Sequence, residues 1–200
     1  MPGWRVGSAT LAKPGALEAA LADAGPGARI YPYFMTGGWF TGDALLQRLE
    51  GARAVVLSPF GRDPGLPEMA AALLSEVMTA QGWQASQVRV FLAAHGSGRS
   101  AQAARDTQGF AAALAAMLPV AELRVGFVEE PPYLADQAFD LGAQAICLPF
   151  FAAKGGHVLD DIPEALDLAE FQGVLLDPIG CAPGAAALVA RSLARAKVPA

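Results

Sequence analysis

Short apolar runs alternate with longer stretches of helical periodicity along most of the chain. Runs with the length and the β-branched or aromatic content of buried strands occur at residues 4–9, 29–34, 54–57, 88–94, 123–128, 145–151 and 174–176. Helical patterns occur between them at residues 14–24, up to 49, at 66–81, from about 163 and at 185–196. Seven strands that alternate with helices predict an α/β fold with parallel strands.

The last third of the chain repeats a pattern from the first third. Residues 174–184 match residues 55–65 at an offset of 119, and 124–126 match 5–7 at the same offset. Two further matches need shifts of one or two positions: 149–151 with 32–34, and 155–157 with 37–39. A duplicated strand–helix unit predicts two lobes, at residues 1–84 and 85–200. No match to the 88–94 run precedes Trp4, so we expect the first lobe to lack its opening strand.

The chain contains two histidines, and each follows a predicted strand and lies next to glycine. His95 follows the 88–94 run, His157 follows the 145–151 run, and the run between them ends at Glu129. Because the carboxyl ends of parallel strands lie at one edge of a sheet, we expect these three side chains to meet there. Two neutral imidazoles and a carboxylate favour a borderline divalent metal ion such as iron, cobalt, nickel or zinc.

Composition narrows the class of protein. With 54% hydrophobic residues, the 200-residue chain can bury a full core, and its formal net charge of -5 with dispersed cations argues against a general nucleic-acid binder. The N-terminal residues lack the pattern of a secretion signal, and no apolar run approaches the ~20 residues of a membrane-spanning helix. We therefore expect a cytoplasmic protein without a membrane partner. The cysteines make no disulfide framework: Cys147 is expected in the core, and Cys181 as a loop thiol.

The two histidine motifs together resemble a known family. Ala94-His95-Gly96-Ser97, combined with Gly155-Gly156-His157-Val158-Leu159-Asp160-Asp161-Ile162-Pro163, resembles the class II tetrapyrrole chelatases of the CbiX and SirB type. These enzymes are the sirohydrochlorin cobaltochelatases and ferrochelatases. Phe127-Val128-Glu129 resembles the Phe-x-Glu at the end of that family's second strand, and Pro149 also fits. The match covers the second lobe, from about Val88 onward.

The resemblance implies a chelatase-like fold, in which each lobe is a small parallel sheet flanked by helices and the tetrapyrrole lies between the lobes. It also implies that His95, Glu129 and His157 are the catalytic and metal-binding residues. The implied reaction inserts cobalt or ferrous iron, with nickel as a further candidate, into sirohydrochlorin or a related tetrapyrrole in cobalamin or siroheme biosynthesis. The metal ion is a substrate, and no organic cofactor is expected. The active species is expected to be a monomer with an internal pseudo-two-fold axis or a homodimer.

Sirohydrochlorin carries many carboxylates, so an acidic protein needs local cations and hydrogen-bond donors to bind it. The expected substrate-binding residues are Ser97, Arg99, Lys154, Gly155 and Gly156. Arg62 is a further candidate at the same edge, and the amide groups near Gly96 would add donors.

Structural interpretations of the same residues stay open. Glu129 could cap a helix together with Glu130, and Asp160 and Asp161 are expected to cap the helix that begins near Ile162. Trp39, which occupies the place of His157 in the first lobe, is expected to pack in a core or between the lobes.

Two alternative functions follow from the same sequence. A carrier that binds metal or tetrapyrrole without turnover would explain why the first lobe lacks the polar residues of the second, with Trp39 at the place of His157. An anion or nucleotide site at the glycine-rich loop after His95 is disfavoured, because the loop has neither Gly-x-Gly-x-x-Gly nor Gly-Lys-Ser/Thr.

Overall fold

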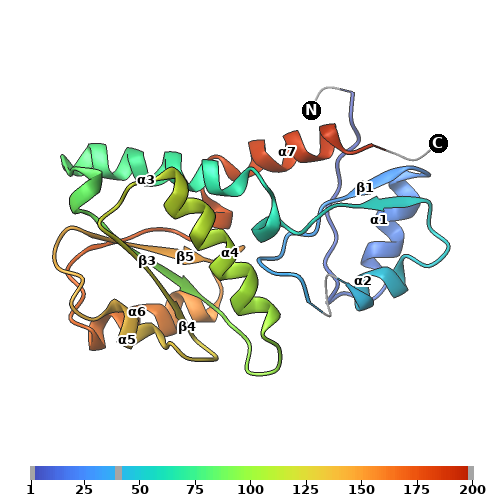
Figure 1. Cartoon of the computed structure of the whole chain (residues 1–200). Helices are drawn as coiled ribbons and strands as arrows, with labels where there is room; N and C mark the ends of the chain where they lie inside the picture. The colour runs from blue at the N-terminus through green and yellow to red at the C-terminus, as the bar shows by residue number, and fades with distance from the viewer. Residues whose placement is uncertain (1–2, 39–41, 198–200) are drawn as a thin grey trace.

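The computed structural model describes residues 3–38 and 42–197 as an α/β molecule of two parts (Figure 1). The larger part holds a four-stranded sheet with the order β4-β3-β5-β6, and the smaller part holds a two-stranded sheet, β1-β2. All strand pairs are parallel, as predicted.

The strands are β1 (Ala28–Ile30), β2 (Ala54–Val56), β3 (Arg89–Ala94), β4 (Glu122–Phe127), β5 (Ala145–Phe150) and β6 (Val174–Leu175). The α-helices are α1 (Ala16–Ala24), α2 (Asp43–Arg48), α3 (Leu66–Gln81), α4 (Gln102–Met117), α5 (Leu134–Ala138), α6 (Ile162–Leu168) and α7 (Ala185–Arg195). Shorter helical turns are η1 (Phe60–Arg62), η2 (Ala85–Gln87), η3 (His157–Asp161) and η4 (Ile179–Cys181). Within the described residues, no helix has the length and apolar character needed to cross a membrane.

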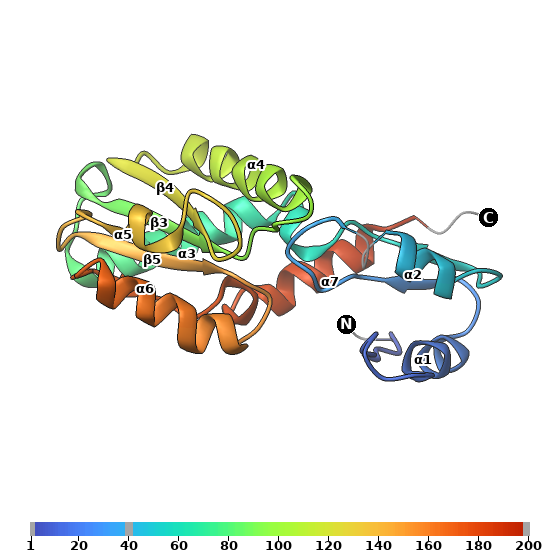
Figure 2. The same ribbon diagram turned by 90° about the horizontal axis from the view of Figure 1, so that it is seen from below.

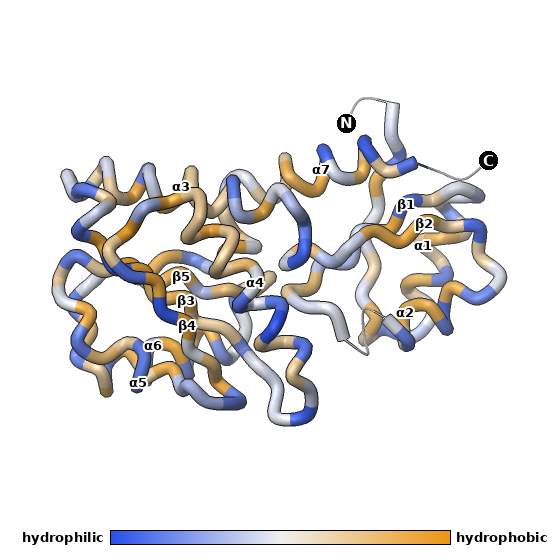
Figure 3. The backbone as a smooth tube through the Cα atoms, in the orientation of Figure 1, coloured by the Kyte–Doolittle hydropathy of each residue, from blue (hydrophilic) through white to orange (hydrophobic). Residues whose placement is uncertain are grey.

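The larger sheet is covered on both faces. Val90 and Leu92 of β3 pack in one core with α3 and α4, while Phe91 and Ala93 pack in a second core with α5 and α6. Figures 1 and 2 show these helix pairs on opposite sides of the sheet, and Figure 3 shows apolar residues along β3 and β5. Cys147 of β5 lies in the second core, as expected, and burial raises the pKa of its thiol. Strands buried on both faces explain why these runs are continuously apolar.

The centre of the larger sheet is a topological switch point. Ala94, at the end of β3, is paired with Phe127 of β4 on one side and with Phe150 of β5 on the other. The chain leaves β3 toward α4 on one face and leaves β5 toward α6 on the other. A crevice between diverging loops at the carboxyl ends of neighbouring strands is where α/β proteins bind ligands. The loops that carry the two histidines begin here.

The smaller part has fewer strands than the sequence predicts. The predicted strand at residues 4–9 is wrong: these residues are exposed and belong to no strand, so the described chain has six strands rather than seven. Val6 is 71% exposed, and Trp4 contacts β1 through the guanidinium of Arg29 rather than through strand pairing. A run that contains Gly7 and Ser8 buries too little apolar surface to dock on a two-stranded sheet.

The predicted internal duplication is visible in the backbone. We call residues 28–69 the first repeat and residues 145–188 the second repeat. The amide of Gly61 donates to the carbonyl of Phe34, and the amide of Gly180 donates to the carbonyl of Phe151, both at 3.0 Å. In both repeats, the same hydrogen bond therefore joins the segment that follows a strand, β1 or β5, to a short helical turn, η1 or η4.

The two repeats meet where α3 and α7 begin. A Cβ atom on Gly65 would lie 2.7 Å from Leu188 of α7, and a Cβ atom on Gly184 would lie 2.8 Å from Met69 of α3. Because these residues correspond at the offset of 119, the reciprocal contacts are those of an internal pseudo-two-fold axis. From this contact between their first turns, α3 packs in a core of the larger part, and α7 extends toward the smaller part (Figure 1). The predicted lobe boundary after residue 84 lies just beyond the end of α3, and α3 packs on the sheet of the larger part.

Candidate metal-binding site

His95 lies directly after β3, in a loop held by the neighbouring strand. The carbonyl of His95 accepts a hydrogen bond from the amide of Glu129 at 3.0 Å. Gly96 has φ 72° and a position where a Cβ atom would lie 2.9 Å from Glu130 Oε1, so only glycine fits without strain. The carboxylate of Glu130 also accepts the amide of Ser97 at 2.7 Å. The loop that carries His95 is thus held by the end of β4 and the two glutamates that follow it.

His157 opens the turn η3, which leads into α6. The carbonyl of Gly155 accepts the amides of Val158 and Leu159 at 3.0 and 3.1 Å, which starts the turn. Val158 and Ile162 are buried in the second core and anchor η3 and α6 to the sheet. This anchoring places the half-buried His157 ring beside His95.

The two imidazoles meet at the switch point. Their Nε2 atoms lie 3.1 Å apart, and their ring planes are nearly perpendicular, at 85°. The other nitrogen of each ring contacts an acceptor: His95 Nδ1 lies 3.0 Å from the carbonyl oxygen of Gly96, and His157 Nδ1 lies 2.5 Å from Asp161 Oδ2. Carbonyl and carboxylate oxygens only accept, so both Nδ1 atoms carry the proton. When both rings are neutral, both Nε2 atoms then present lone pairs toward each other.

Facing lone pairs repel unless a cation lies between them. A divalent first-row ion binds imidazole nitrogen at about 2.0–2.1 Å. Two nitrogens 3.1 Å apart therefore subtend an angle of roughly 100° at such an ion, between the octahedral and the tetrahedral values. The pair has the geometry of two ligands of one metal ion.

The third expected ligand does not complete the set. Glu129 is exposed and is connected to His95 through its backbone amide. Across residues 3–38 and 42–197, no group of three or more His, Cys, Asp or Glu side chains is placed to hold a metal ion. The structure thus brings together two of the three predicted residues.

The expected substrate-binding residues flank the two histidines in the sequence, and Lys154 and Ser97 already have partners. Lys154 Nζ forms an ion pair with Asp177 at 2.7 Å, and the hydrogen bond to this carboxylate raises the pKa of Lys154. The hydroxyl of Ser97 accepts the amide of Arg99 at 3.3 Å, and the Arg99 side chain is exposed. Gly155 and Gly156, the other two candidates, form the exposed start of η3.

Sequence reasoning missed two residues that shape the site. Asp161 was expected to cap α6, but that helix has no side-chain cap, and the Asp161 carboxylate binds His157 instead. The spacing of four residues between His157 and Asp161 on a helical turn was the available signal. Phe151 is the second, with its ring centroid 6.4 Å from that of His95 and 6.5 Å from that of His157.

The first repeat contacts the larger part near the same sheet edge. The amide of Gly37 donates to Asp106 of α4 at 2.7 Å, and Arg62 lies 3.6 Å from the same carboxylate. The hydroxyl of Tyr33 donates to the carbonyl of Gly180 at 2.5 Å. Trp39, the expected counterpart of His157, lies outside the described residues.

A cavity of about 780 Å³ lies elsewhere, between α3 and α7. Tyr31, Asp63 and Ser192 are among its lining residues, and neither histidine is. We place the functional site at the imidazole pair because its nitrogen lone pairs converge, whereas the carboxylate of Asp63 is already hydrogen-bonded to Tyr31 and Ser192.

Comparison with known proteins decides the family. The CbiX family model matches residues 89–196, which span β3 to the end of α7 and include both histidines. The chain belongs to the CbiX family. This membership confirms the predicted class II chelatase and its α/β fold with parallel sheets flanked by helices.

Solved structures agree with this assignment. The chain is 46% identical, with a TM-score of 0.83, to a CbiX described as the terminal enzyme for biosynthesis of siroheme in denitrifying bacteria, covering 94% of this chain and 82% of that one. SirB from Bacillus subtilis with Fe3+ shares the fold at 19% identity and a TM-score of 0.70, over 90% of this chain and 75% of that one. DR2241 from Deinococcus radiodurans, a multi-domain protein, also shares the fold, at 20% identity and a TM-score of 0.68. The match covers 84% of this chain and 41% of that one. No curated protein matches the chain.

Proposed function

We propose that this CbiX-family chain inserts a divalent metal ion into sirohydrochlorin or a close relative, and that His95 and His157 hold the metal. The observation that carries the proposal is the pair of Nε2 atoms 3.1 Å apart. In neutral rings that carry the proton on Nδ1, both of these atoms are free to bind one ion. The ion is a substrate rather than a resident cofactor. Two protein ligands leave coordination positions open for the nitrogens of the macrocycle.

The reaction needs a held metal ion and a base for the pyrrole protons. The Nε2 atoms of both imidazoles are ligands for the ion, and an Nε2 atom that is released when the ion passes to the macrocycle can accept a pyrrole proton. Glu129 is exposed, its amide binds the carbonyl of His95, and we assign it the relay of such a proton outward. Its role is thus proton transfer rather than metal binding.

Ferrous iron is the metal that we favour. The relative at 46% identity is described as an enzyme of siroheme biosynthesis, and siroheme contains iron. Imidazole ligands suit iron, cobalt and nickel alike, so the ligand set does not select among them. Ser97, Arg99, Lys154, Gly155 and Gly156 remain the proposed contacts for the substrate carboxylates. A cytoplasmic enzyme, acting alone or as a homodimer, remains our working assignment.

The test is metal insertion by the purified protein. Sirohydrochlorin would be mixed with Fe(II), or with Co(II), and loss of the free-base absorption followed over many turnovers. His95→Ala and His157→Ala are expected to lower the rate by about 100-fold or more. Leu168→Ala, a change at a side chain that is 72% exposed on α6, should leave it within twofold of the parent. Unchanged insertion by His157→Ala would refute the assignment of the site.

The same measurement separates an enzyme from a carrier. A carrier would bind metal or tetrapyrrole stoichiometrically and would not exceed the uncatalysed rate. Multiple turnovers by the parent protein would exclude it.

A further inference from the structure

We propose that Asp161 is a positioning residue for His157, which acts by holding the proton on Nδ1 so that Nε2 stays free to bind the metal. Its effect on catalysis rests on the proposed function, but its effect on the imidazole does not. Asp161 would contact neither the metal ion nor the tetrapyrrole.

The geometry of η3 supports this role. Asp161 Oδ2 lies 2.5 Å from His157 Nδ1, and the two side chains are equally exposed, at 44%. A carboxylate beside a ring nitrogen fixes both the ring orientation and the tautomer, because the carboxylate accepts only from a protonated nitrogen. The buried residues Val158 and Ile162 hold both ends of this contact on the sheet.

The two histidines are oriented by different means. His95 Nδ1 contacts the carbonyl of the next residue, Gly96, which no side-chain substitution removes. His157 depends on a side chain. A change at Asp161 should therefore alter one imidazole and spare the other.

Asp160 is a matched control within the same turn. It carries the same charge one position earlier, is exposed, and its side chain makes no hydrogen bond or ion pair with any residue that the structure describes. Asp160→Asn and Asp161→Asn change net charge equally, so a difference between them reports the contact with His157.

The first experiment is 15N NMR of the imidazoles in the metal-free protein, under mildly alkaline conditions in which imidazoles are neutral. With two histidines in the sequence, the signals are assigned by His95→Ala. In the parent, we expect the proton of His157 on Nδ1. In Asp161→Asn, the amide can donate to Nδ1, and the proton should move to Nε2, as happens when Asn replaces Asp beside a catalytic histidine. His95 should keep its tautomer.

The second experiment measures Co(II) binding without tetrapyrrole, from the absorption of the bound ion. Asp161→Asn is expected to weaken binding by about 10–100-fold, and Asp161→Glu to recover part of the loss. Asp160→Asn should bind within twofold of the parent.

Three results would overturn the proposal: a proton on Nε2 of His157 in the parent, an unchanged tautomer in Asp161→Asn, or equal Co(II) affinity in the two Asn variants. The parent spectrum is decisive before any assignment, because both imidazoles are expected to carry the proton on Nδ1. If the parent bound Co(II) but did not insert it into sirohydrochlorin, the proposed function would fail, while these results would still decide the role of Asp161.

Discussion

The two repeats share a backbone but differ in the polar groups that they carry. Gly61 and Gly180 make the same hydrogen bond in equivalent turns, and Gly65 and Gly184 make reciprocal contacts at the pseudo-two-fold axis. Yet the second repeat carries His157 and Asp161, whereas the first carries a buried aspartate, Asp63, where the second has Ala182. The repeats keep glycine where the backbone requires it, and they diverge where side chains perform chemistry.

The two polar groups also differ in how completely they are satisfied. The carboxylate of Asp63 accepts from Tyr31 at 2.7 Å, from Ser192 at 2.6 Å and from the amide of Gly65 at 2.9 Å. In contrast, His95 and His157 direct two nitrogen lone pairs at one point. A fully hydrogen-bonded buried carboxylate stabilises a fold, whereas converging lone pairs bind a cation. The first repeat therefore contributes stability, and the second contributes one imidazole of the site, while His95 follows β3, between the two repeats.

The largest expected effect tests the shared backbone. A Cβ atom on Gly61 would lie 1.7 Å from the carbonyl oxygen of Met35, and one on Gly180 would lie 2.2 Å from that of Ala152. Since backbone atoms cannot yield cheaply, Gly61→Ala and Gly180→Ala should each lower the free energy of unfolding by about 4 kcal/mol or more. Denaturant unfolding would measure the loss.

Gly109→Ala is the control for these two changes. Gly109 lies within α4, and a Cβ atom there would meet nothing within 4 Å, so alanine should stabilise the helix by about 0.5–1 kcal/mol. If Gly61→Ala and Gly180→Ala were as stable as the parent, the repeats would not share the constrained turn.

The second prediction converts the first repeat into the second at one position. Asp63→Ala copies Ala182 and leaves the hydroxyls of Tyr31 and Ser192 without their acceptor. Leaving these half-buried donors unpaired should cost about 1–3 kcal/mol in the free energy of unfolding, while metal insertion per folded molecule stays near the parent rate. Asp167→Ala, at an exposed aspartate of α6, should change stability by less than about 0.5 kcal/mol. Equal stability of the two variants would contradict the structural role of Asp63.

The sequence was sufficient to predict the parts of the fold that depend on long apolar patterns. Helix α3 has the predicted bounds, 66–81, and β3 and β5 differ from their predicted ranges by one residue. The placement of both histidines at one sheet edge followed from parallel strands alone. The strand at 4–9 failed because a short run of alternating character has no partner strand to pair with, and pairing is a tertiary property.

The details of the site were harder to predict because they depend on side-chain direction within turns. The sequence pointed to Glu129 as the site carboxylate, but in the structure Glu130 holds the amide of Ser97, and Glu129 is exposed. Likewise, Asp160 and Asp161 are equal candidates for a helix cap until the turn η3 directs Asp161 at His157. A shift of one residue along a turn changes the direction of the side chain by about 100°.

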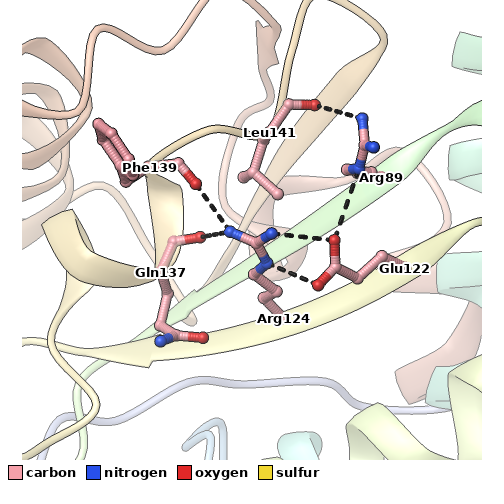
Figure 4. Close-up of polar contacts among 6 residues, drawn as sticks. All are labelled: Arg89, Glu122, Arg124, Gln137, Phe139 and Leu141. Carbon is pink, nitrogen blue, oxygen red and sulfur yellow. Dashed lines mark hydrogen bonds and ion pairs between the residues drawn. The ribbon is translucent and has the colours of Figure 1, made fainter.

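The smallest expected effect concerns two arginines, Arg5 and Arg124, that occupy corresponding positions in the two halves of the chain. Arg124 forms two hydrogen bonds with Glu122, at 2.7 and 3.0 Å, and a third with the carbonyl of Phe139 at 2.7 Å (Figure 4). Its counterpart at the offset of 119 is Arg5, which is 70% exposed and pairs with Asp23. Arg124→Gln should cost about 1–2 kcal/mol in the free energy of unfolding, and Arg5→Gln almost nothing.

The pH dependence of unfolding distinguishes this ion pair from simple packing. The hydrogen bonds from Arg124 lower the pKa of Glu122 below its ordinary value. A lowered carboxyl pKa in the folded state contributes stability above the ordinary pKa of about 4.3, and that contribution is lost as the pH falls through the folded value. The stability difference between the parent and Arg124→Gln should therefore shrink between about pH 5 and pH 3. Because the Glu122 side chain is 39% exposed, solvent screens the pair, and the shrinkage should stay below about 1 kcal/mol. A constant difference across this range would mean that Arg124 stabilises β4 through its contacts with backbone carbonyls rather than through the charge of Glu122.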